Sequence, residues 1–137
     1  MDVYELIDYW CKEAQDDLHC FPDDNAMESV KNIYYALAGQ GNCIIYNLEE
    51  MKGCMVYCII PDFRGGMTLN ELFMYIKPEH RGSIRLFKKL VEHVEQVAKE
   101  NNCSSVRIAS NIGYNDQKVL RVLKLWGYET DVVVKYL

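Results

Sequence analysis

A long amphipathic helix between two apolar strands constrains the fold of this chain more than any other feature. The apolar residues of the helix recur at helical spacing, at Phe87, Leu90, Val91, Val94, Val97 and Ala98. The segment before it, LNELFMYI at 69–76, and the segment after it, SVRIAS at 105–110, both have the composition of strands. Because a helical crossover joins them, the two strands lie parallel if they share one sheet.

The other segments extend this unit into a single domain, residues 1–137. Apolar spacing predicts a first helix through 3–14 and a second that begins at 23–25 and is closed by Gly39. Apolar segments at 42–47 and 53–60 precede 69–76 with short connections, which favours an antiparallel meander. A last helix begins at Asn115 or Asp116 and ends at Gly127, before a final strand at 130–137. The predicted order is α-α-β-β-β-α-β-α-β, an α/β (α+β) domain with a mixed central sheet flanked by helices.

Length and composition argue against several classes of protein. The chain has 137 residues, 50% hydrophobic and 26% charged, which is typical of one folded domain. No apolar run reaches the ~18 residues of a membrane span, and the acidic N-terminus does not resemble a signal peptide. The net charge of −5 disfavours nucleic-acid binding. The six cysteines lack metal-site spacing, so we expect reduced thiols, no metal and a cytoplasmic location.

Four cations lie where the central helix begins, which is the unfavourable end for positive charge. They are Arg81, Arg85, Lys88 and Lys89. A helix N-terminus presents backbone N–H groups that bind phosphate, and the Arg-Gly-Ser turn at 81–83 adds a cation, a flexible residue and a hydroxyl. The stretch therefore predicts an anion-binding turn. The alternative is a basic helix face that is simply solvated.

The segment from Glu71 to the C-terminus resembles the GNAT superfamily of N-acetyltransferases. That family joins an apolar strand through a short loop to an Arg/Gln-x-x-Gly-x-Gly/Ala turn that opens a long helix, and this chain has LFMYIKPEHRGS at 72–83. A Gly-Phe or Gly-Tyr precedes the family's last strand, and this chain has VLRVLKLWGYETDVVVKYL at 119–137. The earlier helices and strands also fit the family's order. The compact length and ELFMYIKPEHRG look most similar to small phage or prophage members.

The resemblance implies acetyl-CoA as cosubstrate. It assigns the pantetheine arm to Met74, Tyr75 and Ile76, and the pyrophosphate to Arg81, Gly82, Ser83, Ile84, Arg85 and Leu86. Asn111 and Asn115 fall where family members bind the pantetheine or adenine. The chain departs from the family at the two signature glycines, which are Ile84 and Leu86 here. It also has Leu123 where a tyrosine is frequent.

The resemblance also implies catalytic roles in acetyl transfer to an amine. Glu71, on a strand where many family members have a glutamate, is the candidate general base. The family's usual acid is missing, so Tyr114, just past the strand at 105–110, is the nearest candidate acid. A surface glutamate and a packing tyrosine are the plainer interpretations. The first two helices form the acceptor wall in the family. The expected acceptor is a primary amine of a protein or of a small molecule, attracted by the acidic N-terminal half. The alternative is a GNAT-shaped protein that binds a partner protein without catalysis.

Overall fold

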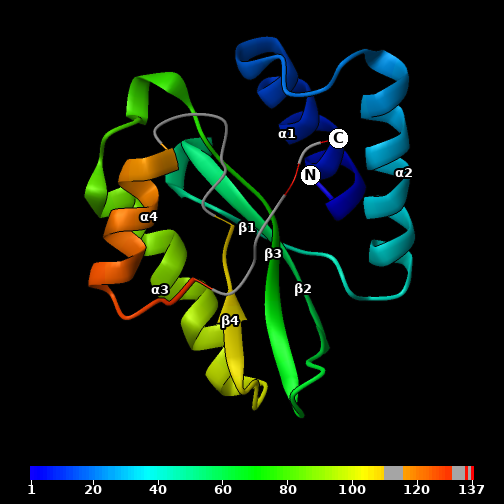
Figure 1. Ribbon diagram of the computed structural model, residues 1–137. Helices are drawn as coiled ribbons and strands as arrows, with labels where there is room; N and C mark the ends of the chain where they lie inside the picture. The colour runs from blue at the N-terminus through cyan, green and yellow to red at the C-terminus, as the bar shows by residue number, and fades with distance from the viewer. Residues whose placement is uncertain (110–115, 131–134, 136) are drawn as a thin grey trace.

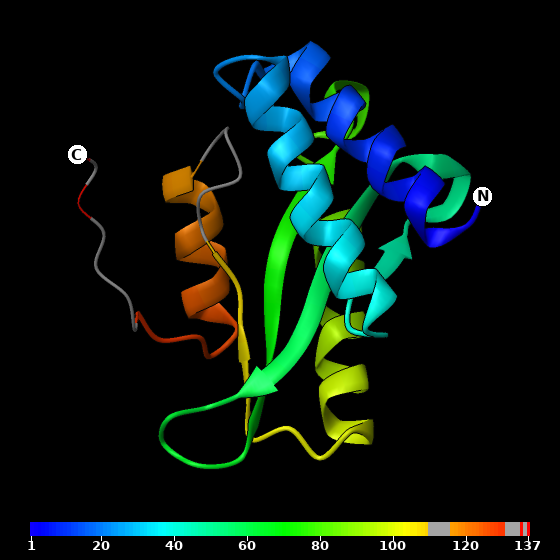
Figure 2. The same cartoon turned by 90° about the vertical axis from the view of Figure 1, so that its right-hand side faces the viewer.

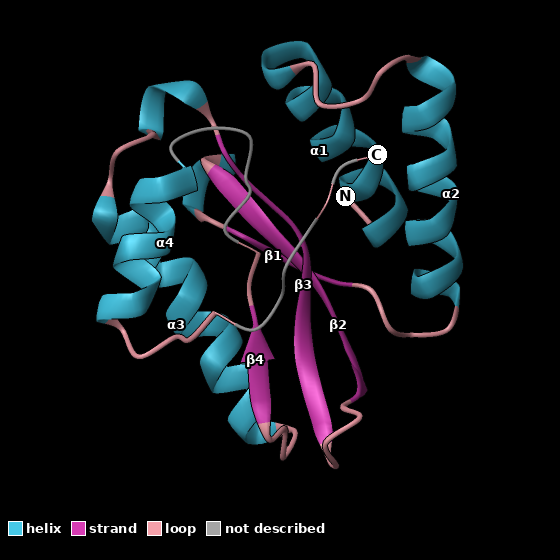
Figure 3. Cartoon of the chain, viewed as in Figure 1, coloured by secondary structure: helices cyan, strands magenta, loops and turns pink. Residues whose placement is uncertain are grey.

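Two pairs of helices enclose one four-stranded sheet (Figures 1 and 3). The computed structural model describes residues 1–109, 116–130, 135 and 137. The α-helices and strands are α1 (Val3–Leu18), α2 (Asp24–Gly39), β1 (Ile44–Asn47), β2 (Gly53–Pro61), β3 (Met67–Ile76), α3 (Ile84–Glu100), β4 (Ser105–Arg107) and α4 (Asp116–Leu125), and short 3-10 helices lie at Glu49–Met51 and Pro78–His80. This order confirms the prediction as far as α4. Residues 131–134 and 136 of the predicted last strand lie outside the described residues.

The sheet has the strand order β1-β2-β3-β4. The first three strands pair antiparallel, and β3 pairs parallel with β4 across the α3 crossover. Both pairings were predicted, because short connections allow only antiparallel neighbours and a helical crossover favours parallel ones.

Two strands are shorter than the sequence predicted. β1 begins at Ile44 and not at Asn42, because the Asn42 side chain replaces a backbone pair: it donates to the Ile59 carbonyl and accepts from the Ile59 N–H, each at 2.9 Å. β4 ends at Arg107 and not at residue 110, because the Ala109 N–H binds the Glu71 carboxylate.

The starts of α1, α2 and α3 each have a polar side chain that accepts a backbone N–H. Asp2 accepts from Glu5, Asp23 from Ala26, and Ser83 from Leu86. Such caps satisfy donors that the helix itself leaves unpaired, which is why the predicted helix start at 23–25 is confirmed. The last helix begins at Asp116, one of the two predicted positions.

The sheet separates two cores, one under each helix pair (Figure 2). The α1–α2 core packs Ile7, Trp10, Ala14 and Met27 against Cys54, Val56 and Tyr75. The α3–α4 core packs Leu90, Val91, Val94 and Leu123 against Met55, Tyr57 and Leu69. Alternate residues of β2 therefore face opposite cores, as the period of a strand requires.

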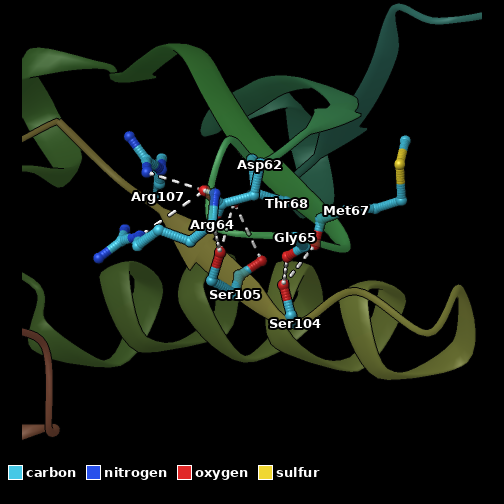
Figure 4. A network of polar contacts seen from close by, with 8 residues as sticks. All are labelled: Asp62, Arg64, Gly65, Met67, Thr68, Ser104, Ser105 and Arg107. Atoms are coloured by element: carbon cyan, nitrogen blue, oxygen red, sulfur yellow. Dashed lines mark hydrogen bonds and ion pairs between the residues drawn. The ribbon is translucent and has the colours of Figure 1, made fainter.

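The hairpin between β2 and β3 is tied to the start of β4 by a polar cluster (Figure 4). The Asp62 carboxylate, on a side chain only 4% exposed, accepts from the Ser105 hydroxyl at 3.3 Å and lies 3.6 Å from the Arg107 guanidinium. The Ser105 hydroxyl also lies 2.8 Å from the Thr68 hydroxyl. Since buried carboxylates need such partners, the cluster fixes β4 against one end of β3.

Candidate functional site

Strand β3 continues past the end of β4 and leaves an open edge. β4 pairs with β3 only from Thr68 to Asn70, and within the described part of the chain the segment 71–76 pairs with β2 alone. Met74, Tyr75 and Ile76 are each at most 5% exposed as whole residues. The edge is therefore open in the sense that its backbone N–H and C=O groups on this side have no strand partner among the described residues, although these residues are buried.

A β-bulge lies at the start of this open edge. Tyr57 of β2 pairs with Glu71, whereas its neighbour Val56 pairs with Phe73, so Leu72 is an extra residue on β3. Leu72 and Phe73 both pack toward the α1–α2 core, although consecutive strand residues normally face opposite sides. The Tyr34 hydroxyl of α2 donates to the Leu72 carbonyl at 3.5 Å, which adds a contact from the helix to the bulge.

Glu71 lies where β3 and β4 separate. Its Oε2 accepts a hydrogen bond of 3.3 Å from the Ala109 N–H, just past the end of β4. The Ala109 N–H thus binds a side chain and not the backbone of β3, which explains why the β3–β4 pairing ends before residue 110, the predicted end of the strand. Burial raises the pKa of Glu71 to about 7, and the hydrogen bond from Ala109 offsets only part of that shift. A carboxyl of this kind can take or give a proton near neutral pH.

The start of α3 is open toward solvent. Gly82 has a φ of +84°, and a Cβ placed on it would meet no atom within 4 Å. Ser83 caps the N–H of Leu86 at 3.3 Å, so the helix leaves the N–H groups of Ile84 and Arg85 without intrahelical partners. The Leu86 side chain is 2% exposed and packs in the α3–α4 core, whereas Ile84 is 52% exposed. Of the two residues at the family's glycine positions, Leu86 therefore points into the core, away from solvent.

Arg81 contacts the sheet and α1. Its Nε donates to the Ile76 carbonyl at 3.1 Å, and its Nη2 donates to the Asp17 carboxylate. The guanidinium carbon lies 5.5 Å from the centre of the Tyr75 ring, and the Tyr75 hydroxyl donates to the same Asp17 oxygen at 2.9 Å. Arg81 is thus held by three groups at the end of the open edge.

The other cations at the start of α3 have carboxylate partners. Arg85 and Lys89 lie 3.7 Å and 3.4 Å from the Glu49 carboxylate, in the connection between β1 and β2. Lys88 lies 3.6 Å from Glu92 along the helix. All these side chains are largely exposed, so the pairs contribute little to stability and can rearrange around a ligand.

The aromatic residues of α1 and α2, which the resemblance assigns to the acceptor wall, lie partly in the α1–α2 core and partly against β3 and the loop that follows it. Trp10 is 1% exposed and donates to Asn47 at 2.8 Å, so it belongs to the core. The Tyr9 hydroxyl accepts from Lys77, in the loop after β3, at 2.7 Å. Tyr34 contacts the bulge beside Glu71, and burial, followed by the nearby Cys11 and Glu71, raises its pKa well above the usual range. Tyr35 packs against Tyr4.

Three predicted site residues, Asn111, Tyr114 and Asn115, lie outside the described residues. Leu123, at the position of the family's frequent tyrosine, is 3% exposed in the α3–α4 core. Sequence reasoning missed Asp17, because an aspartate near the end of a helix resembles an ordinary surface charge. One signal was available: a carboxylate in the last turn of a helix opposes the helix dipole, so it favours a nearby cation.

Within the described ranges, no group of three or more His, Cys, Asp or Glu side chains could hold a metal ion. No described helix has the length and apolarity needed to cross a membrane.

Comparisons with known proteins identify the fold and the family. No curated protein matches the sequence. A putative acetyl transferase from Pyrococcus furiosus has a similar structure, with a TM-score of 0.75 and 18% identity over 98% of this chain and 93% of that one. A GCN5-related N-acetyltransferase from Ralstonia eutropha has a TM-score of 0.76 and 9% identity over 98% and 93%.

A predicted acetyltransferase from Clostridium acetobutylicum, solved with acetyl-CoA, has a TM-score of 0.70 and 16% identity over 98% of this chain and 88% of that chain. Identities this low show a shared fold. The sequence model of the acetyltransferase (GNAT) family matches residues 5–128. Since that match spans most of the chain, including the open edge of β3 and the start of α3, the chain belongs to the GNAT family of acetyltransferases.

Proposed function

We propose that this acetyltransferase moves the acetyl group of acetyl-CoA to a primary amine, either of a protein or of a small molecule. The observation that carries the proposal is the position of Glu71, a carboxyl with a pKa of about 7 where β3 and β4 separate. It lies on the same strand as the open edge that leads to the start of α3. A backbone edge, a helix start and a proton acceptor are what such a transfer requires.

The residues present fit a CoA-type ligand. The N–H groups of Ile84 and Arg85 lie at the positive end of the α3 dipole, beside the uncrowded Gly82, where a pyrophosphate would bind. The exposed cations Arg85 and Lys89 add positive charge. The open backbone edge of β3 suits an extended amide-bearing arm. When bound, the thioester supplies an activated acetyl group.

Glu71 would prepare the acceptor. A lysine-like amine has a pKa of about 10.4 in water and is protonated near neutral pH, so it must lose a proton before it can attack. A carboxylate whose pKa is about 7 is a stronger base than an ordinary glutamate, and it can take that proton directly or through a water molecule. A backbone N–H of the open edge would stabilise the negative charge on the carbonyl oxygen.

Binding of CoA to matched variants tests the donor site. Ile84→Asp adds a negative charge to an exposed first-turn residue, where the helix dipole tolerates it but a pyrophosphate would not. Ile33→Asp makes the same change at an equally exposed isoleucine on α2. Isothermal titration should show weaker CoA binding, by about tenfold, for Ile84→Asp alone. No heat from the wild-type protein with millimolar CoA would contradict the proposal and favour a binding protein without catalysis.

The acceptor class needs a separate experiment. The protein is incubated with labelled acetyl-CoA and cell lysate, and mass spectrometry identifies the species that gain label. The proposal predicts label on amines, either lysine side chains and N-termini or small amines. Label confined to hydroxyl groups would contradict it.

A further inference from the structure

Asp17 connects the first helix to the turn that precedes α3. It lies in the last turn of α1, far in sequence from that turn. Its Oδ2 accepts from the Arg81 guanidinium and, at 2.9 Å, from the Tyr75 hydroxyl, while the side chain itself is 23% exposed. Tyr75 is 1% exposed and its hydroxyl also lies 3.5 Å from the Glu13 carbonyl of α1. The carboxylate is therefore a junction between α1, the end of β3 and the turn.

The position of Arg81 determines the path of the chain into α3. The Arg81 Nε donates a hydrogen bond to the Ile76 carbonyl, at the end of the open edge. Arg81 is followed in the chain by Gly82, with a φ of +84°, and by Ser83, which caps α3. Because Arg81 is fixed from two directions, the N–H groups after Ser83 keep one orientation relative to β3. Binding groups held in place before the ligand arrives lose less conformational entropy on binding.

We propose that Asp17 is a positioning residue for the acyl donor, which acts through Arg81 to hold the turn before α3 in its binding conformation. The inference rests on the proposed function, because it concerns the same donor site. Asp17 contacts the side chains of Arg81 and Tyr75, and neither the backbone of the open edge nor the N–H groups at the start of α3, so its effect is indirect. The hydrogen bond from Arg81, followed by that from Tyr75 among the favourable contacts, lowers the pKa of Asp17, which keeps it ionised near neutral pH.

The test compares Asp17→Asn with Asp16→Asn. Both variants remove one negative charge from adjacent positions of α1, but Asp16 is exposed. The asparagine at 17 still accepts hydrogen bonds, so folding should survive while the charge-assisted contact is lost. We expect the Kd for CoA to rise by about tenfold in Asp17→Asn and by less than twofold in Asp16→Asn, as the loss of one charge-assisted hydrogen bond implies.

Kinetics separate positioning from plain stabilisation of the fold. Asp17→Asn should raise KM for acetyl-CoA and leave kcat and the acceptor KM unchanged, and Asp17→Glu, which keeps the carboxylate, should recover part of the affinity. Tyr75→Phe removes one of the two donors to Asp17 and should raise the Kd less than Asp17→Asn does. It serves as the second variant if Asp17→Asn folds poorly.

Each other outcome overturns the inference. If Asp17→Asn has a lower Tm but the wild-type Kd, Asp17 only stabilises the fold. If its Kd falls, Asp17 withholds Arg81 from the ligand, which is the opposite role. If CoA binds the wild type and both asparagine variants equally, the inference fails and the proposed function stands. If CoA does not bind the wild type, both fail.

Discussion

At the residue scale, the environment of a side chain decides what its sequence position can do. Glu71 was predicted as a base from a family resemblance, and the structure adds the buried setting that raises its pKa to about 7. The sequence could not supply this, because the side chain lies against the end of β4, where Ala109 is 38 positions away in the sequence. Leu86 likewise resembled an obstacle to phosphate binding until its side chain proved to lie in the core.

The pKa of Glu71 predicts an acid limb in the rate profile. As a base Glu71 must be ionised, so kcat/KM should fall as the pH drops through about 7. Glu71→Gln should lower the rate by about 100-fold and remove that limb, which a pH series of initial rates measures. Glu92→Gln, at an exposed position of α3, is the control and should keep the limb. An unchanged limb in Glu71→Gln would assign it to another group.

The same shift affects stability. Between the unfolded pKa of about 4.3 and the folded value of about 7, the folded state holds a proton that the unfolded state has lost. The free energy of unfolding therefore falls as the pH rises through that window, and Glu71→Gln should remove this contribution. Chemical denaturation at several pH values measures how the free energy of unfolding changes with pH.

At the element scale, periodicity and connection lengths predicted each α-helix and strand through α4 and the direction of each pairing. The strand ends were less predictable, because side chains replaced backbone partners there. Asn42 binds both backbone groups of Ile59, and Glu71 binds the Ala109 N–H. A side chain that substitutes for a ladder hydrogen bond leaves no periodic signal in the sequence.

The close approach of β2 to β3 predicts a sensitive glycine. A Cβ on Gly53 would lie 2.5 Å from the Tyr75 carbonyl oxygen, which is backbone and cannot rotate away. Gly53→Ala should therefore lower the free energy of unfolding by about 1–3 kcal/mol, as overpacking does. In Gly39→Ala, at the end of α2, the Cβ meets only the Tyr4 hydroxyl at 3.8 Å, so no loss is expected. Urea denaturation of both variants decides; equal stabilities would contradict the prediction.

At the scale of the whole molecule, the two cores and the mixed sheet follow from the order of the elements. The predicted reduced thiols also fit, since all six cysteines are free. What the sequence could not show is how α1 reaches across to the turn before α3. That contact depends on the packing of both against β3, and it joins residues 64 positions apart.

The buried thiols predict how the molecule reacts with a thiol reagent. Burial raises the pKa of Cys11 to about 12 and that of Cys43 to about 11, whereas Cys20 is exposed. The native protein should show a fast reaction at Cys20 and a reaction at the four buried cysteines that is at least about 10³-fold slower, limited by unfolding. Cys20→Ser should remove the fast phase. A fast reaction of Cys11 or Cys43 would mean that the α1–α2 core opens readily.

The extra residue Leu72 gives β3 one position at which a residue can be lost. Beyond the bulge, Tyr75 faces the α1–α2 core and Met74 faces the α3–α4 core, with Leu69 before the bulge also on the α3–α4 side. Because Leu72 and Phe73 face the same core, deletion of Leu72 would restore regular alternation and leave Tyr75 and Met74 on their present sides. A single-codon deletion at 72 would therefore straighten the strand, whereas one at 74 would turn Tyr75 away from Asp17.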